Sequence, residues 1–201
     1  MKLDVEMTMI PGTLMDKQAM GNVSGLAFLN KIFYISDGIM LSQIRDICGI
    51  DGSTLQNWTK RGWIPSAINK RYHKDQLARI LMINMLRDSM QLDKIAALFC
   101  YVNGVTEDTS DDIIPESELY DYLCRVTDRL VSDELPPDLN ENSLRALIEL
   151  TLADYREKVS GARERLVNAC EIMIEAYWAS LVKQKANRLF DSLFAVNENR
   201  T

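Results

Sequence analysis

The chain has a single histidine, His73, among 201 residues, and its four cysteines lie far apart in the sequence (Cys48, Cys100, Cys124 and Cys170). These absences exclude a multi-histidine metal centre and leave no Cys-x-x-Cys pair for zinc or redox chemistry. Scattered free thiols suit a reducing compartment, so we expect a cytoplasmic protein. A glycine-rich phosphate loop and a Gly-x-Ser-x-Gly elbow are also missing, and we therefore expect neither an enzyme nor a bound cofactor.

Long hydrophobic runs are absent as well. The longest uncharged stretch, residues 18–30, contains two glycines and two asparagines. It is too short and too polar to span a bilayer, and the N-terminus has no basic region typical of a signal peptide. We therefore expect no membrane partner. The content of 47% hydrophobic and 26% charged residues is that of a globular protein with a core of its own.

The net charge of −6 hides an asymmetry along the chain. Residues 1–104 carry 12 Lys and Arg against 9 Asp and Glu, whereas residues 105–201 carry 11 against 20. Within residues 60–87 there are seven basic side chains and one acidic side chain. A basic segment in an acidic protein indicates an anionic partner for that segment, although a charged stretch is commonly a solvated face.

Composition divides the chain into four parts. We expect residues 1–35 to pack on the domain that follows, residues 36–104 to form a head domain and residues 105–115 to form an acidic linker. Clustered acids among Ser and Thr mark that linker. Residues 116–201 are expected to form an acidic helical domain for dimerisation or for sensing an effector.

The head begins with a pattern of two short helices. Apolar residues at helical spacing predict a helix over 41–48, and Gly49 stands where a helix-ending glycine is expected. After a tight turn, Ser53 or Thr54 can cap a second helix that runs to about residue 61. A basic connector of hairpin length, residues 66–72, follows it.

The second helix has two chemically different faces. Leu55 and Trp58 lie three residues apart and predict a buried stripe, while the opposite face carries Ser53, Gln56, Asn57, Lys60 and Arg61. Gln and Asn can pair with adenine edges, and Lys and Arg can reach guanine or phosphate. A helical hairpin whose polar face is merely solvated fits this pattern equally well.

Two helices, a glycine-containing turn and a basic hairpin together describe a winged helix-turn-helix. The predicted fold class is all-α with a small β-hairpin wing, in which a winged head precedes a helical-bundle tail. Trp58 is expected in the core with Leu55. For Trp63 both a core position and a contact with a sugar-phosphate backbone remain open, and His73 is expected to pack or cap rather than to sense pH.

The connected string over residues 42–104 resembles the DNA-binding head of the MerR-type winged-helix regulators. Residues 54–65 read Thr-Leu-Gln-Asn-Trp-Thr-Lys-Arg-Gly-Trp-Ile-Pro, where that family has Thr-Leu-Arg-Tyr-Tyr-Glu and then Gly-Leu-Ile. Residues 70–77, Lys-Arg-Tyr-His-Lys-Asp-Gln-Leu, correspond to the end of the wing and the start of the next helix. The Gln-Asn-Trp core and the Tyr-Val-Asn-Gly string at 101–104 are similar to an uncharacterised bacterial family, the domain-of-unknown-function family 1836, which is described as MerR-like.

This resemblance covers about residues 37–123 and implies a head that binds double-stranded DNA. It departs from the MerR pattern where Gln-Asn-Trp replaces Arg-Tyr-Tyr, and no long coiled-coil helix follows the head directly. Position by position it implies groove contacts by Gln56, Asn57 and Lys60, a wing of Lys70, Arg71 and Tyr72, and phosphate contacts by Ser53 and Thr54. With the neighbouring bases, the candidate DNA-binding residues are Ser53, Thr54, Gln56, Asn57, Lys60, Arg61, Lys70, Arg71, Tyr72 and Lys74.

The tail carries seven-residue repeats. Helices are expected over 142–158 and 162–194, as two helices or as one continuous helix. The repeats are Leu152, Val159, Leu166 and Met173 with Tyr155, Ala162, Ala169 and Ala176. This spacing fits a dimer seam and equally fits packing inside the tail's own bundle. A further apolar stripe leaves the last helix apolar on two sides. The candidate effector or dimer surface comprises Met173, Tyr177, Trp178 and Leu181.

Two functions are therefore expected from different classes. The first is a transcription regulator that binds double-stranded DNA as a homodimer, with a small-molecule effector of unknown identity as a further partner. The alternative is a protein-interaction adaptor that uses a MerR-like fold without sequence-specific DNA binding. The modest charge of the head and the loss of Arg from the second helix favour that alternative.

Overall fold

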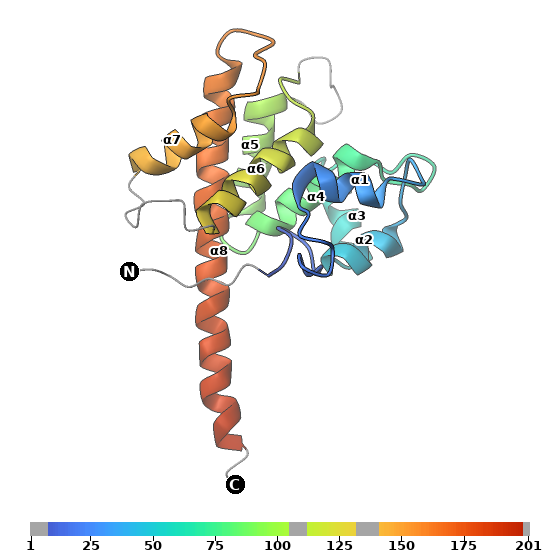
Figure 1. Ribbon diagram of the computed structural model, residues 1–201. Helices are drawn as coiled ribbons and strands as arrows, with labels where there is room; N and C mark the ends of the chain where they lie inside the picture. The colour runs from blue at the N-terminus through green and yellow to red at the C-terminus, as the bar shows by residue number, and fades with distance from the viewer. Residues whose placement is uncertain (1–7, 105–111, 132–140, 199–201) are drawn as a thin grey trace.

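The computed structural model describes residues 8–104, 112–131 and 141–198, which form eight α-helices (Figure 1). In chain order they are α1 (Gly25–Ile32), α2 (Leu41–Cys48), α3 (Gly52–Lys60), α4 (Lys74–Leu86), α5 (Leu92–Asn103), α6 (Glu116–Val131), α7 (Glu141–Thr151) and α8 (Ala162–Glu198). Over these ranges β-structure is limited to isolated bridges. The all-α class is thus confirmed. No helix in the described ranges has the length and hydropathy that crossing a bilayer requires.

Helix α4 is the centre of the molecule. Ten of its 13 residues are buried, and it packs against α2, α5, α6 and α8. A helix that is apolar around most of its circumference must be covered on several sides, and α4 is covered in this way. One hydrophobic cluster therefore runs from the α1–α4 region into the α6–α8 region.

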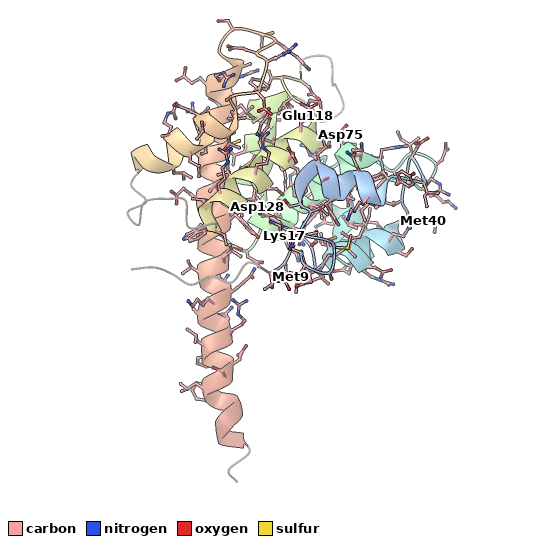
Figure 2. All side chains as sticks on the ribbon, viewed as in Figure 1. Met9, Lys17, Met40, Asp75, Glu118 and Asp128 are labelled. Atoms are coloured by element: carbon pink, nitrogen blue, oxygen red, sulfur yellow. The ribbon has the colours of Figure 1, made fainter. Side chains whose placement is uncertain are left out.

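The segment before α1 is fastened to α6 by polar contacts. Lys17 Nζ lies 2.5 Å from Asp128 Oδ1, and the Ser24 hydroxyl donates to the other carboxylate oxygen at 2.8 Å (Figure 2). The Tyr120 hydroxyl donates to the carbonyl oxygen of Pro11 at 2.7 Å in the interior. Helix α1 itself packs along α6. These contacts join the start of the chain to a helix more than 90 residues later.

The predicted helix over 142–158 is shorter in the structure. Helix α7 ends at Thr151, and the chain reaches α8 through a loop in which Gly161 has φ +80°. The two expected helices are therefore separate, so the predicted seven-residue repeats do not follow one helix. Most of the predicted linker, residues 105–111, lies outside the described residues, while Ile113 and Ile114 at its end are buried.

Helix α8 has a buried half and a projecting half. Its first half packs against α4, α5, α6 and α7, whereas its C-terminal half extends well beyond the other helices (Figure 1). Of the predicted repeat positions, Ala162, Leu166, Ala169 and Met173 are fully buried within the protomer. These positions pack inside the protomer.

Candidate nucleic-acid interface

Helices α2 and α3 are joined by a three-residue turn. Gly49 ends α2 in the left-handed conformation, with φ 70°, as the sequence predicts. Ile50 is buried beneath the turn, and Asp51 is the N-cap residue of α3. The one apolar side chain of the turn therefore belongs to the same hydrophobic cluster as the buried residues of α2, α3 and α4.

The cap of α3 differs from the prediction. The carboxylate of Asp51 accepts hydrogen bonds from the Thr54 backbone N–H and hydroxyl, both at 2.8 Å, and from the Ser53 hydroxyl at 2.5 Å. These bonds hold the pKa of Asp51 well below its usual range. Ser53 and Thr54 thus lie inside the helix, and their hydroxyls donate hydrogen bonds to the Asp51 carboxylate. A negative charge already occupies the helix N-terminus, where a phosphate would otherwise be favoured.

The two faces of α3 are separated as the sequence predicts. Leu55 and Trp58 are buried, with exposed fractions of 0% and 1%. All five residues of the predicted polar face are exposed: Ser53, Gln56, Asn57, Lys60 and Arg61. The Arg61 guanidinium lies 5.1 Å from the centre of the half-buried Trp63 ring. Helix α3 therefore presents amides and cations to solvent from a rigid apolar base.

A tight turn stands beside α3 at residues 68–71. Ile68 and Arg71 exchange two backbone hydrogen bonds of 2.9 Å, and the two residues between them, Asn69 and Lys70, both have positive φ. Two consecutive residues of positive φ define a type I′ turn, whose second position favours glycine. Lysine occupies that position, and its side chain is exposed at the tip.

The predicted wing residues have different surroundings. Tyr72 is buried, with its backbone paired to Ile39 by bonds of 2.8 and 2.9 Å, and burial raises the pKa of its hydroxyl although a hydrogen bond with Thr59 opposes the rise. Because its side chain is buried, Tyr72 has little surface for a direct contact with nucleic acid. Arg71 is exposed and donates to the Gly38 carbonyl oxygen at 2.8 Å. Only its remaining N–H groups can reach a ligand.

Two further residues next to the turn have structural partners. The half-buried Lys74 donates from Nζ to Asn30 Oδ1 at 2.7 Å, so this candidate is attached to α1. His73 is the N-cap residue of α4, and its Nδ1 lies 2.7 Å from the Asp37 carbonyl oxygen. His73 thus stands at the N-cap position, and its ring contacts the segment before α2.

One basic side chain of the segment 60–87 is not on the surface. Arg79 is 3% exposed, forms an ion pair with Glu116 of α6, and donates from Nε to the Trp63 carbonyl oxygen at 2.6 Å. Its guanidinium also stacks 4.5 Å from the centre of the Phe99 ring. Burial raises the pKa of Glu116 to about 7, and the charge of Arg79 opposes that rise. The positive surface is therefore smaller than the sequence suggests.

Two residues that shape this surface, Asp51 and Arg79, were not assigned these roles from the sequence, although the sequence contains a signal for each. Asp51 belongs to an Asp-x-x-Thr string, and aspartate is among the preferred N-cap residues. Arg79 lies inside the apolar pattern of α4, where a cation implies a buried partner. Its partner is 37 residues away in the sequence, however, and no local pattern identifies it.

The candidate effector or dimer surface on α8 is mostly interior. Met173 and Tyr177 are buried in the protomer core, and burial holds the pKa of the Tyr177 hydroxyl far above its usual range. Trp178 and Leu181 are half-buried. Only these last two have surface that a ligand or partner could touch. Cys100 differs from the other three cysteines in being exposed.

Comparison with known proteins gives one finding. Residues 28–123 match the model of a family described as a domain of unknown function (DUF1836). The matched region runs from within α1 to the middle of α6 and contains the candidate interface. No curated protein and no solved structure gives a significant match to the chain.

Proposed function

We propose that the protein is a cytoplasmic, non-enzymatic transcription regulator that binds double-stranded DNA through a MerR-like winged helix-turn-helix and acts as a homodimer. The observation that carries this proposal is the exposed face of α3, on which Gln56, Asn57 and Lys60 stand opposite the buried Leu55 and Trp58. Amides and cations fixed on a rigid helix are suited to reading base edges in the major groove.

The neighbouring turn supplies a second line of support. Lys70 stands in a backbone conformation that lysine adopts at a cost of about 1–2 kcal/mol, since its side chain meets the following carbonyl in the left-handed region. Such strain persists at functional sites when a side chain is needed there. A lysine at the tip of a turn beside α3 is suited to contact a phosphate, as the wing of such a domain does.

We assign the contacts accordingly. Gln56 and Asn57 read bases, and Lys60, Arg61 and Lys70 bind phosphates or guanine. Arg71 contributes a weaker phosphate contact beside its structural bond. Four residues of the candidate DNA-binding set have a structural role in this assignment: Ser53, Thr54, Tyr72 and Lys74. Each forms a hydrogen bond within the protein and so helps to hold the interface in place.

Titration of a short fluorescent duplex at several salt concentrations tests the proposal. The logarithm of the binding constant should fall linearly with the logarithm of salt concentration, and Lys70→Ala should reduce the slope by about one unit. Lys94→Ala, which removes an exposed lysine of α5, is the matched control and should leave the slope unchanged. An equal loss in both variants would assign the binding to overall charge and refute the interface.

The adaptor remains a second candidate because two observations reduce the positive surface. Asp51 places a carboxylate at the start of α3, and Arg79 is neutralised in the interior by Glu116. An acidic protein partner would contact Lys60, Arg61 and Lys70 without reading Gln56 or Asn57. Binding to DNA that is insensitive to sequence, together with a stoichiometric partner recovered from nuclease-treated lysate, would favour the adaptor.

A further inference from the structure

The loop between α1 and α2, residues 33–40, carries two large apolar side chains at its tip. Tyr34 is 86% exposed and Ile35 is 94% exposed, which are the two highest values among the large apolar side chains of the described ranges. Phe33, just before them, is partly buried against the hydrophobic cluster, and Ile39, just after them, is buried in it. The chain is therefore anchored in the core on both sides of a tip that lies in solvent.

This tip is fastened to the turn at residues 68–71. Arg71 Nη1 donates to the Gly38 carbonyl oxygen at 2.8 Å and to the Ser36 hydroxyl oxygen at 3.4 Å. The Ser36 hydroxyl donates to the same carbonyl oxygen at 2.8 Å. The approach is close, because a Cβ added at Gly38 would lie 2.8 Å from the Cβ of Arg71. Figure 1 shows the loop and the turn side by side at the edge of the molecule away from α8. The tip is thus preorganised, and a partner does not have to order it on binding.

The charges next to the tip are mostly positive. Lys70 and Arg71 of the turn are both exposed. Asp37 supplies the one carboxylate of residues 33–40, and it is exposed as well. Two cations therefore stand against one carboxylate beside an apolar tip. This combination indicates a partner that carries negative charge and offers an apolar space that a side chain can enter.

The minor groove of double-stranded DNA has both properties. Phosphates line its edges, and its floor consists of stacked bases, between which DNA-binding proteins insert Phe, Leu, Ile or Met side chains. The place of the tip suits this groove in the complex proposed above. When α3 lies in the major groove and Lys70 contacts a phosphate, the tip beside the turn falls at the adjacent minor groove. That groove is about half a helical turn, or about five base pairs, from the bases that α3 contacts.

We propose that Ile35 inserts between two base pairs from the minor groove, with Tyr34 lying along the sugars, so that the tip selects a deformable base step. Insertion partly unstacks the step, and pyrimidine–purine steps such as TA and CA unstack most easily. The DNA site should therefore contain such a step at a fixed distance from the bases that α3 contacts, although no hydrogen bond reads the step. This inference rests on the proposed function and adds a second source of specificity to it.

Selection from a randomised library of DNA duplexes by the full chain tests this assignment. The parent protein should enrich a pyrimidine–purine step about five base pairs from a core of specific bases. Ile35→Ser should keep the core and lose the preference for the step, whereas Asn57→Ala should lose a base of the core and keep the step. On the selected duplex, Ile35→Ser should raise the Kd about tenfold, because insertion no longer buries an apolar side chain.

Two further variants and a spectroscopic signal isolate insertion from other effects. Leu150→Ser on α7 is the matched control, since it removes a leucine that is 63% exposed, and it should behave as the parent. Ile35→Leu should retain the affinity and the step, because leucine also inserts between bases. The fluorescence of 2-aminopurine placed in the selected step should rise with the parent and with Ile35→Leu, but not with Ile35→Ser. Circular dichroism verifies that each variant folds.

The outcomes separate this inference from the proposed function. Equal selection and equal affinity for the parent and Ile35→Ser, with unchanged 2-aminopurine fluorescence, would overturn the insertion and leave the regulator intact. A parent that binds no duplex even at low salt would reject the regulator, and the insertion with it. If Ile35→Ser lost binding to vesicles that contain phosphatidylserine, and bound DNA as the parent does, the tip would belong to a lipid surface and the insertion would be wrong.

Discussion

Replacement of Arg79 by Met should destabilise the protein strongly and in a pH-dependent way. The Arg79 side chain is 4% exposed and the Glu116 side chain 11% exposed. Methionine retains most of the apolar volume but leaves the Glu116 carboxylate buried without its counter-charge. Removing one partner of a buried ion pair costs about 3–5 kcal/mol, and the bond to the Trp63 carbonyl oxygen is lost as well.

The sign of the pH dependence follows from the pKa of Glu116. Burial raises this pKa to about 7 in the parent, with the carboxylates of Asp75 and Asp112 acting in the same direction and Arg79 opposing. A carboxyl whose pKa is higher in the folded state keeps its proton only there, so stability falls as pH rises between the unfolded and folded values. The free energy of unfolding of the parent protein should therefore level off above pH 7.

In Arg79→Met the pKa of Glu116 rises further, so stability should continue to fall above pH 7, by up to about 1.4 kcal/mol per pH unit. Urea unfolding at several pH values between 6 and 9 measures this difference. Arg79→Met/Glu116→Gln is the matched control, and it should lack the additional slope and be more stable than the single variant at pH 8. The reasoning would be refuted if Arg79→Met lowered the free energy of unfolding by less than about 1 kcal/mol at pH 8 and this free energy did not change with pH above 7.

Three further predictions concern the candidate interface. Gln56→Ala and Asn57→Ala should each lower discrimination at one base position by roughly 1–3 kcal/mol, measured by competition among duplexes with single substitutions, and uniform losses across sequences would contradict base reading. Lys70→Gly should raise the free energy of unfolding, measured in urea, by about 1 kcal/mol, because glycine adopts the left-handed conformation freely. The same variant should weaken DNA binding. A lower free energy of unfolding would show that the turn is not strained. Asp51→Asn should keep the cap of α3 and strengthen DNA binding, because it removes a negative charge. Asp51→Ala should lower the melting temperature, because it removes the cap. Equal melting temperatures for the parent and Asp51→Ala would refute the capping role.

Periodicity predicted a helix best where a strong boundary accompanies it. The range 41–48 agrees with α2, because helical spacing of apolar residues coincides there with a glycine that ends the helix. Gly49 illustrates the physics, since only its left-handed conformation lets the chain leave α2 and enter the turn. Burial of Leu55 and Trp58 followed from their three-residue spacing.

Local patterns failed where distant residues decide the structure. Tyr72 looked like an exposed wing residue, but pairing with Ile39 draws it into the core. Arg79 looked like part of a basic surface, but Glu116 of α6 holds it inside. The helix over 142–158 was predicted too long because its seven-residue spacing continues through a loop that contains no glycine before Gly161. The repeat itself does not reveal whether the chain between its positions is helical.

The measurement that tests the central claim most directly is capture of fragmented genomic DNA by the purified full chain at near-physiological salt, followed by sequencing. We predict enrichment of a short, two-fold symmetric site that is lost in Asn57→Ala and retained in Lys94→Ala, as expected for a dimer that places two copies of α3 in major grooves. Recovery of the same unselected fragments by the parent and by Asn57→Ala would contradict the account.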